Sequence, residues 1–140
     1  MPRYTPDGFD IILGGATYSI EEEDDSPNGS FTITRATLEA GYQVGFIPRT
    51  DRVRYGVTSW ATTKSPEALE YLLWACAERF HGICAYVGFW KDTDGTFHVD
   101  PSEHMNTLDG ALHYGRSFGQ YSVWDWAKMD DIEVPQSGVE

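Results

Sequence analysis

The chain has 140 residues, of which 41% are hydrophobic and 14% aromatic, and its formal net charge is −12. This length and apolar content predict one packed domain over residues 1–140 rather than a disordered chain. The charge argues against direct binding to nucleic acid phosphates or anionic membranes, and no apolar run in the sequence is long enough to span a membrane.

The N-terminal residues show no basic segment followed by an apolar core, so we expect no secretory signal peptide. Cys76 and Cys84 lie inside apolar runs. That setting favours small buried thiols in a reducing compartment over a disulfide. Together these features predict a cytoplasmic protein.

Residues 1–50 are expected to form a β-hairpin or meander with an acidic tip. Alternating apolar residues between Gly and Pro breakers predict short strands at 9–13 (continued by 16–20), 31–34 and 42–47. Residues 21–30 hold five adjacent carboxylates followed by Pro-Asn-Gly. Mutual repulsion and turn-forming residues are typical of an exposed loop.

Residues 51–128 predict the order strand–helix–strand–strand–helix–strand. The first helix begins at the N-cap Ser65 with Pro66 in its first position, and Gly82 ends it. The second helix is capped by Asn106 and ended by Gly119. The expected strands are 53–61, 83–90, 96–100 and 120–127.

This order of elements predicts an α+β domain with the ferredoxin-like split βαβ arrangement and an N-terminal β-hairpin extension. Right-handed crossovers would place both helices on one face of the sheet. The hairpin of residues 1–50 would then either extend the sheet or cover its other face. Residues 129–140 are expected to form a flexible acidic tail.

The outer face of the first helix is the first candidate site, for a protein partner. At 100° per residue, the residues opposite the apolar stripe are Glu67, Glu70, Tyr71, Trp74 and Glu78. An outward Trp ringed by carboxylates suits a partner with a basic surface. The alternative is that the N-terminal segment or a second subunit covers Trp74.

Two further sets of residues form a second candidate site, for a small ligand. Period-two alternation predicts an aromatic face of the sheet that includes Tyr86, Trp90, His98, Trp124 and Trp126. Three cations would clamp a phosphate or carboxylate, or instead pair with the acidic surface: Arg49, Arg52 and Arg54. The alternatives for the aromatic face are that the N-terminal hairpin covers it or that a homodimer forms through it.

His98, Asp100, Glu103 and His104 lie close in the sequence and would make an acid–base or metal site only if they converged. A polar strand end leading into a helix is the simpler interpretation. Residues 92–95 end in Asp-Gly, which predicts a hairpin turn. Because the sequence contains no nucleophile elbow, phosphate loop, dinucleotide fingerprint or Cys-x-x-Cys, we assign no catalytic residue, cofactor or metal.

Three short motifs stand in the C-terminal half: G-x-W-x-D at residues 88–92, V-D-x-S-E at 99–103, and W-D at 124–125. In these motifs the last 60 residues or so resemble small uncharacterised proteins encoded by bacteriophages of actinobacteria. The resemblance implies a phage accessory protein, a class in which small acidic members bind and block host factors. It transfers no catalytic residue.

The sequence therefore predicts a non-enzymatic phage accessory protein in the cytoplasm of an infected host. It would bind and modulate a host protein with a basic surface, in an anti-defence or nucleic-acid-mimic role. The alternative is an oligomeric protein that sequesters a small molecule. A third hypothesis is an enzyme with a His, Asp and Glu site.

Overall fold

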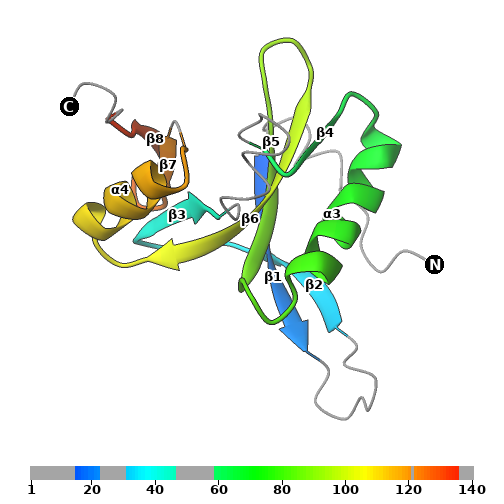
Figure 1. The fold of residues 1–140 in the computed structure, drawn as a ribbon, viewed down its shortest axis with the longest axis horizontal. Helices are drawn as coiled ribbons and strands as arrows, with labels where there is room; N and C mark the ends of the chain where they lie inside the picture. The colour runs from blue at the N-terminus through cyan, green and yellow to red at the C-terminus, as the bar shows by residue number, and fades with distance from the viewer. Residues whose placement is uncertain (1–14, 23–30, 47–58, 121, 136–140) are drawn as a thin grey trace.

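The computed structural model describes residues 15–22, 31–46, 59–120 and 122–135. In this part of the chain two helices lie on one eight-stranded antiparallel sheet (Figure 1). The strands are β1 (Gly15–Glu22), β2 (Phe31–Ala36), β3 (Tyr42–Gly45), β4 (Ala61–Thr63), β5 (Tyr86–Lys91), β6 (Phe97–Met105), β7 (Ser122–Asp125) and β8 (Asp130–Glu133). The helices are α3 (Pro66–Phe80) and α4 (Leu108–Ser117). Neither is long and apolar enough to cross a membrane.

Helix α3 confirms its predicted boundaries. The Ser65 hydroxyl accepts a hydrogen bond from the amide of Ala68 at 3.2 Å, and Pro66 is the first helical residue. The chain leaves the helix through Gly82, whose φ of +83° suits a residue without a Cβ. Helix α4 is capped by Thr107, not by Asn106, because it is the Thr107 hydroxyl that accepts from the amide of Gly110.

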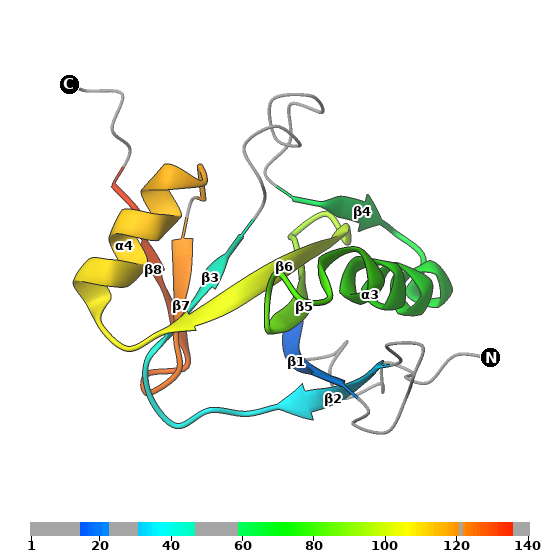
Figure 2. The same cartoon turned by 60° about the horizontal axis from the view of Figure 1, so that its bottom comes forward.

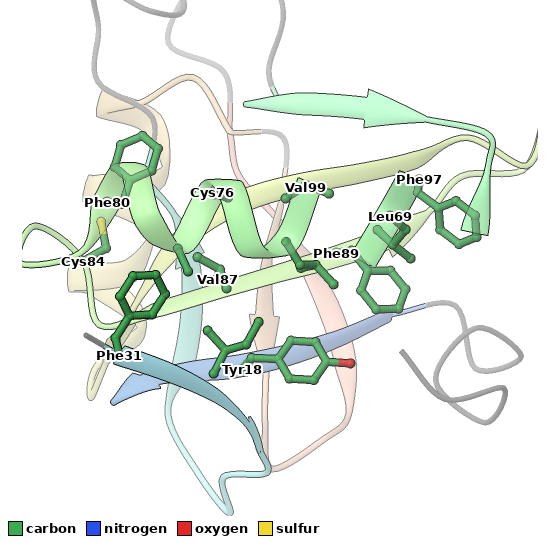
Figure 3. Close-up of a cluster of buried hydrophobic side chains, with 13 residues drawn as sticks. Tyr18, Phe31, Leu69, Cys76, Phe80, Cys84, Val87, Phe89, Phe97 and Val99 are labelled. Carbon is green, nitrogen blue, oxygen red and sulfur yellow. The ribbon is translucent and has the colours of Figure 1, made fainter. Parts of the chain in front are cut away.

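The larger core lies between α3 and the strands β2, β1, β5 and β6 (Figure 3). Apolar side chains from all of these elements are buried there, among them Tyr18, Phe31, Leu69, Leu73, Phe80, Val87 and Val99. Each fully buried side chain of this size stabilises the fold by about 1.5–3 kcal/mol. Cys76 and Cys84 are buried in the same cluster as free thiols, which confirms the prediction made from their apolar surroundings.

Strand β6 organises the sheet because its two halves pair with different partners along one edge. β5 pairs with one edge of β6, while β4 pairs with residues 97–99 and β3 with residues 102–105 on the other. Pro101 lies between the two partners, and its carbonyl accepts from the amide of Phe46. The ring nitrogen of Pro101 cannot donate a hydrogen bond, and it points to this same edge. Because Pro101 lies between the residues that pair with β4 and those that pair with β3, neither pairing loses a hydrogen bond.

This pairing does not confirm the ferredoxin-like arrangement. That arrangement needs the first and last strands of the βαββαβ unit to be neighbours. In the described chain β4 pairs with β6, whereas β7 pairs with β3 and β8. A strand of the N-terminal segment thus takes the place between β6 and β7 (Figure 2). Two split βαβ units are present. The unit β4–α3–β5 encloses β6, and the unit β6–α4–β7 encloses β3.

The ends of the chain also differ from expectation. The β1–β2 hairpin extends the sheet through the pairing of β1 with β5. β1 contains the predicted strand residues 16–20, and the predicted strand 9–13 lies outside the described residues. Residues 130–133, expected in a flexible tail, form β8 against β7. Their acidic side chains are exposed, while Ile132 and Val134 pack under α4. This alternation is that of a half-buried edge strand.

Both helices cover the same face of the sheet, as the crossover rule predicts. Phe97 and Val99 of β6 belong to the core under α3, and Met105, an even number of residues further, packs in the second cluster with Val44 and Ala111 of α4. Because side chains alternate along a strand, these residues of β6 share one face. The opposite face carries His98, Asp100 and Ser102.

Candidate functional site

The outer face of α3 holds the residues predicted to bind a partner, and they differ in accessibility. Glu67 and Glu78 are exposed, and Tyr71 retains 71% of its accessible surface. They share one side of the helix because they are separated by four and seven residues. The face therefore presents an accessible phenol between two carboxylates.

Trp74 and Glu70 belong to the same face, but both are half-buried and therefore less accessible than Tyr71. The ring of Trp74 lies against Phe31 of β2, with centroids 4.7 Å apart, and it packs against the core. Phe31 in turn stacks on His81, at 4.9 Å. The N-terminal hairpin thus covers Trp74, as the alternative interpretation proposed, and Tyr71 is the outward aromatic residue.

The residues of the predicted ligand site are not brought together. The rings of Trp90 and His98 stack at 4.1 Å with an interplanar angle of 8°, and Trp90 is 48% exposed. Trp124 and Trp126 meet edge to face at 6.4 Å, on the same face of the sheet but at β7 and the residue after it. Three strand spacings, or about 14 Å, separate β5 from β7. Tyr86 lies on β5, half-buried, and Arg49, Arg52 and Arg54 lie outside the described residues.

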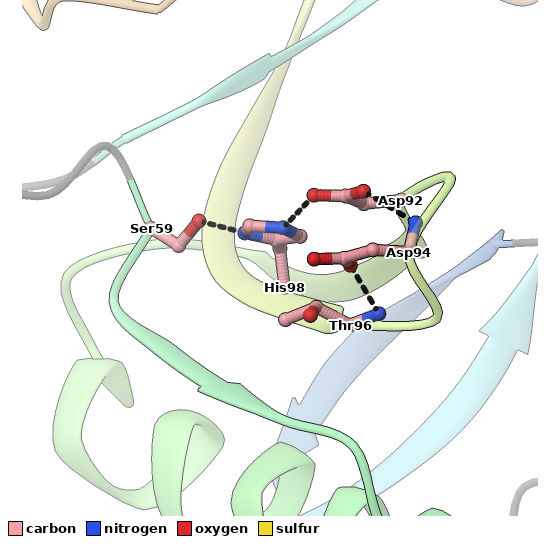
Figure 4. Close-up of polar contacts among 5 residues, drawn as sticks. All are labelled: Ser59, Asp92, Asp94, Thr96 and His98. Atoms are coloured by element: carbon pink, nitrogen blue, oxygen red, sulfur yellow. Dashed lines mark hydrogen bonds and ion pairs between the residues drawn. The ribbon is translucent and has the colours of Figure 1, made fainter.

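His98 instead belongs to a hydrogen-bonded chain that the sequence did not reveal (Figure 4). Its Nδ1 is 2.7 Å from the Ser59 hydroxyl, and its Nε2 is 3.0 Å from Oδ2 of Asp92. Asp92 is held in the β5–β6 turn, where its other oxygen accepts from the amide of Asp94. Ser59 comes from the residues before β4, so its bond to His98 spans 39 positions of the chain.

A Ser–His–Asp chain of this kind can in principle activate a serine, with the imidazole as base and the carboxylate as its orienting group. Here Ser59 is only 3% exposed, and neither cavity described below is lined by any of the three residues. The contacts join the segment before β4 to the β5–β6 turn. We therefore assign these hydrogen bonds a structural role.

The residues of the predicted acid–base cluster point in different directions. Asp100 and Glu103 lie on opposite faces of β6, and Nε2 of His104 donates to the carbonyl of Ala40 at 2.9 Å. Burial raises the pKa of Asp100 to about 7, against the opposing effect of the Trp60 amide, which donates to its Oδ1 at 2.9 Å. Asp100 thus acts as a partly buried acceptor for the residues before β4.

Two cavities open on the helix-bearing face, and neither was predicted. The first, of about 300 Å³, lies between α4 and strands β3 and β6 and is lined by Val44, Gly45, Phe46, Glu103, His104, Met105, Tyr114 and Phe118. The second, of about 340 Å³, adjoins the end of α3 and is lined by Ile20, Glu22, His81, Gly82, Ile83, Cys84, Ala85 and Glu103. Glu103 is common to both. Sequence periodicity could not reveal them, because they form where elements distant in sequence diverge.

Within the described ranges no three His, Cys, Asp or Glu residues are grouped so that they could hold a metal ion. Comparison of the chain with known protein families, with curated proteins and with solved structures found no match. The candidate sites must therefore be judged on their geometry and charge.

Proposed function

We propose that the protein is a non-enzymatic binding protein that engages a basic partner through the outer face of α3. The observation that carries this proposal is the exposure of Tyr71 between Glu67 and Glu78. Tyrosine offers a large amphipathic surface at low conformational entropy cost, and it is enriched at the centres of interfaces. The side chain has no evident role in the core, since the opposite side of α3 makes the core contacts.

The charge of the chain determines the kind of partner. With 22 Asp and Glu residues against 10 Lys and Arg, the protein attracts basic surfaces at long range and accelerates their association. A partner that normally binds nucleic acid has such a surface. This favours inhibition by occupation of a phosphate-binding face, in an anti-defence or nucleic-acid-mimic role.

The setting of the interaction is part of the same proposal. The resemblance of the C-terminal motifs to proteins of actinobacterial phages supports a host protein as the partner and the cytoplasm of the infected cell as the place. The −12 charge and the exposed residues of α3 are compatible with this setting but independent of it.

The test is a pull-down from nuclease-treated lysate of an actinobacterial host, with the combined variant E67Q/Y71A/E78Q beside the wild type. The matched control is D130N/E133Q, which removes two carboxylates from the exposed edge strand β8. We expect a stoichiometric basic protein that is retained by the control, lost in the α3 variant and released by salt. Capture that is independent of salt and survives the α3 substitutions would refute the proposal.

A further inference from the structure

The two cavities on the helix-bearing face share Glu103 as a lining residue, one beside α4 and the other beside the C-terminal end of α3. We call the pair of cavities the Glu103 groove; Glu103, Phe46, Tyr114 and Phe118 all line the first of them. Two large apolar side chains are exposed on its opposite sides, Tyr114 of α4 at 45% and Ile83 after α3 at 53%. The two side chains are thus accessible to a ligand that enters either cavity.

Aromatic rings form the wall of the groove on the α4 side. Phe46 and Phe118 are in contact with centroids 4.5 Å apart, and Tyr114 lies parallel to Phe118 at 6.4 Å and 10°. The faces of such rings carry partial negative charge and attract organic cations. A planar cation is favoured further, because it stacks on rings.

Glu103 supplies a carboxylate between the two cavities. Partial burial raises its pKa, against the effect of the Ala85 amide, which donates to it. None of the ion pairs found among the described residues involves Glu103; they join His81 to Glu22 and His98 to Asp92. A desolvated carboxylate without a cation costs free energy, and a cation that enters the groove would recover part of it.

We propose that the Glu103 groove binds an arginine side chain of the basic partner, with the guanidinium against the Glu103 carboxylate and the rings of Tyr114 and Phe118. Arginine is chosen over lysine because its planar, weakly hydrated fork both pairs with a carboxylate and stacks on aromatic faces. The identity of the partner rests on the function proposed above. The chemistry of the groove does not.

The test uses the full chain and two peptides, acetyl-Gly-Arg-Gly-amide and its citrulline counterpart, which keeps the shape of arginine but lacks the charge. NMR titration follows the ring resonances of Phe46, Tyr114 and Phe118. We expect saturable shifts with the arginine peptide and at least tenfold weaker binding of the citrulline peptide. Equal binding of the two peptides would overturn the proposal.

Two variants locate the site. E103Q keeps the size of the side chain and should weaken arginine-peptide binding at least tenfold, and F118L should weaken it while preserving the apolar wall. Wild-type affinity in a folded E103Q chain would overturn the assignment. A chain with Arg49, Arg52 and Arg54 all changed to Gln tests the chain's own arginines, and peptide binding seen only in that variant would overturn the assignment to a partner.

The outcome separates this inference from the proposed function. The α3 variant E67Q/Y71A/E78Q should bind the arginine peptide as the wild type does, because its substitutions lie outside the groove. Peptide binding without any captured partner would support the groove and count against the proposed function. If a partner is captured, its binding is unaffected by E103Q and no peptide binds, the result would support the proposed function and count against the groove.

Discussion

The indole nitrogen of Trp126 donates a hydrogen bond to Oε1 of Gln43 at 3.0 Å, across 83 positions of the chain. The amide nitrogen of Gln43 donates to the Ser102 hydroxyl, also at 3.0 Å. All three residues are about 7% exposed. One side chain therefore joins β3 to β6 and to the residue that follows β7, on the face of the sheet opposite the helices.

Replacing Gln43 by Leu should lower the free energy of unfolding by about 1–3 kcal/mol for each buried group that it leaves unpaired, here the Trp126 N–H and the Ser102 hydroxyl. Urea denaturation would measure the loss. Trp126→Phe serves as the second arm of a double-mutant cycle. If Trp126→Phe costs the same in both backgrounds, the two side chains are not energetically coupled.

Truncation of Trp74 should destabilise the fold far more than truncation of Tyr71. Trp74→Ala removes the contact with Phe31 and should destabilise the fold by about 2 kcal/mol or more, since the side chain is half-buried in the core. Tyr71→Ala should change stability by less than about 0.5 kcal/mol, because the side chain is 71% exposed. Thermal denaturation distinguishes them, and equal losses would contradict the packing described for α3.

Ser59 should be chemically inert. Although its hydroxyl lies 2.7 Å from Nδ1 of His98, the residue is 3% exposed, so a fluorophosphonate probe should not label it. Mass spectrometry of the treated protein provides the measurement, and an active serine hydrolase provides the positive control. Labelling that disappears in both Ser59→Ala and His98→Ala would reveal a nucleophile and refute the non-enzymatic proposal.

Asp100 should make stability depend on pH. Its pKa is about 7 in the folded protein against an ordinary 3.8, so the folded state holds a proton that the unfolded state releases. Its contribution therefore falls as pH rises from about 3.8 to 7. Asp100→Asn removes the ionisation and keeps an acceptor for the Trp60 amide.

Relative to wild type, the Asp100→Asn variant should gain stability between pH 5 and pH 7, by at most about 1.4 kcal/mol per pH unit. Partial exposure of Asp100 reduces this gain. Urea denaturation at pH 5, 6 and 8 would measure it. A difference between variant and wild type that is constant over this range would show that Asp100 ionises normally.

The sequence predicts the features that depend on neighbouring residues. The cap at Ser65, the buried stripe of α3, the free thiols and the Asp-Gly turn follow from local chemistry and period. The position of β3 between β6 and β7 could not be predicted, because short strands carry no signal that names their partner. The same holds for Phe31 over Trp74 and for Ser59 beside His98, since each contact joins segments about 40 residues apart.

The division of β6 between two partners has a consequence for how the chain folds. During synthesis β3 is made before either of its neighbours, because β6 and β7 lie about 60 and 80 residues further along the chain. Sheets that depend on such distant pairings have high contact order and fold slowly, in milliseconds to seconds. Until β3 docks, half of one edge of β6 stays open in the nascent chain. Such an edge is a template for pairing with a second copy, so aggregation during expression should depend on how fast β3 docks.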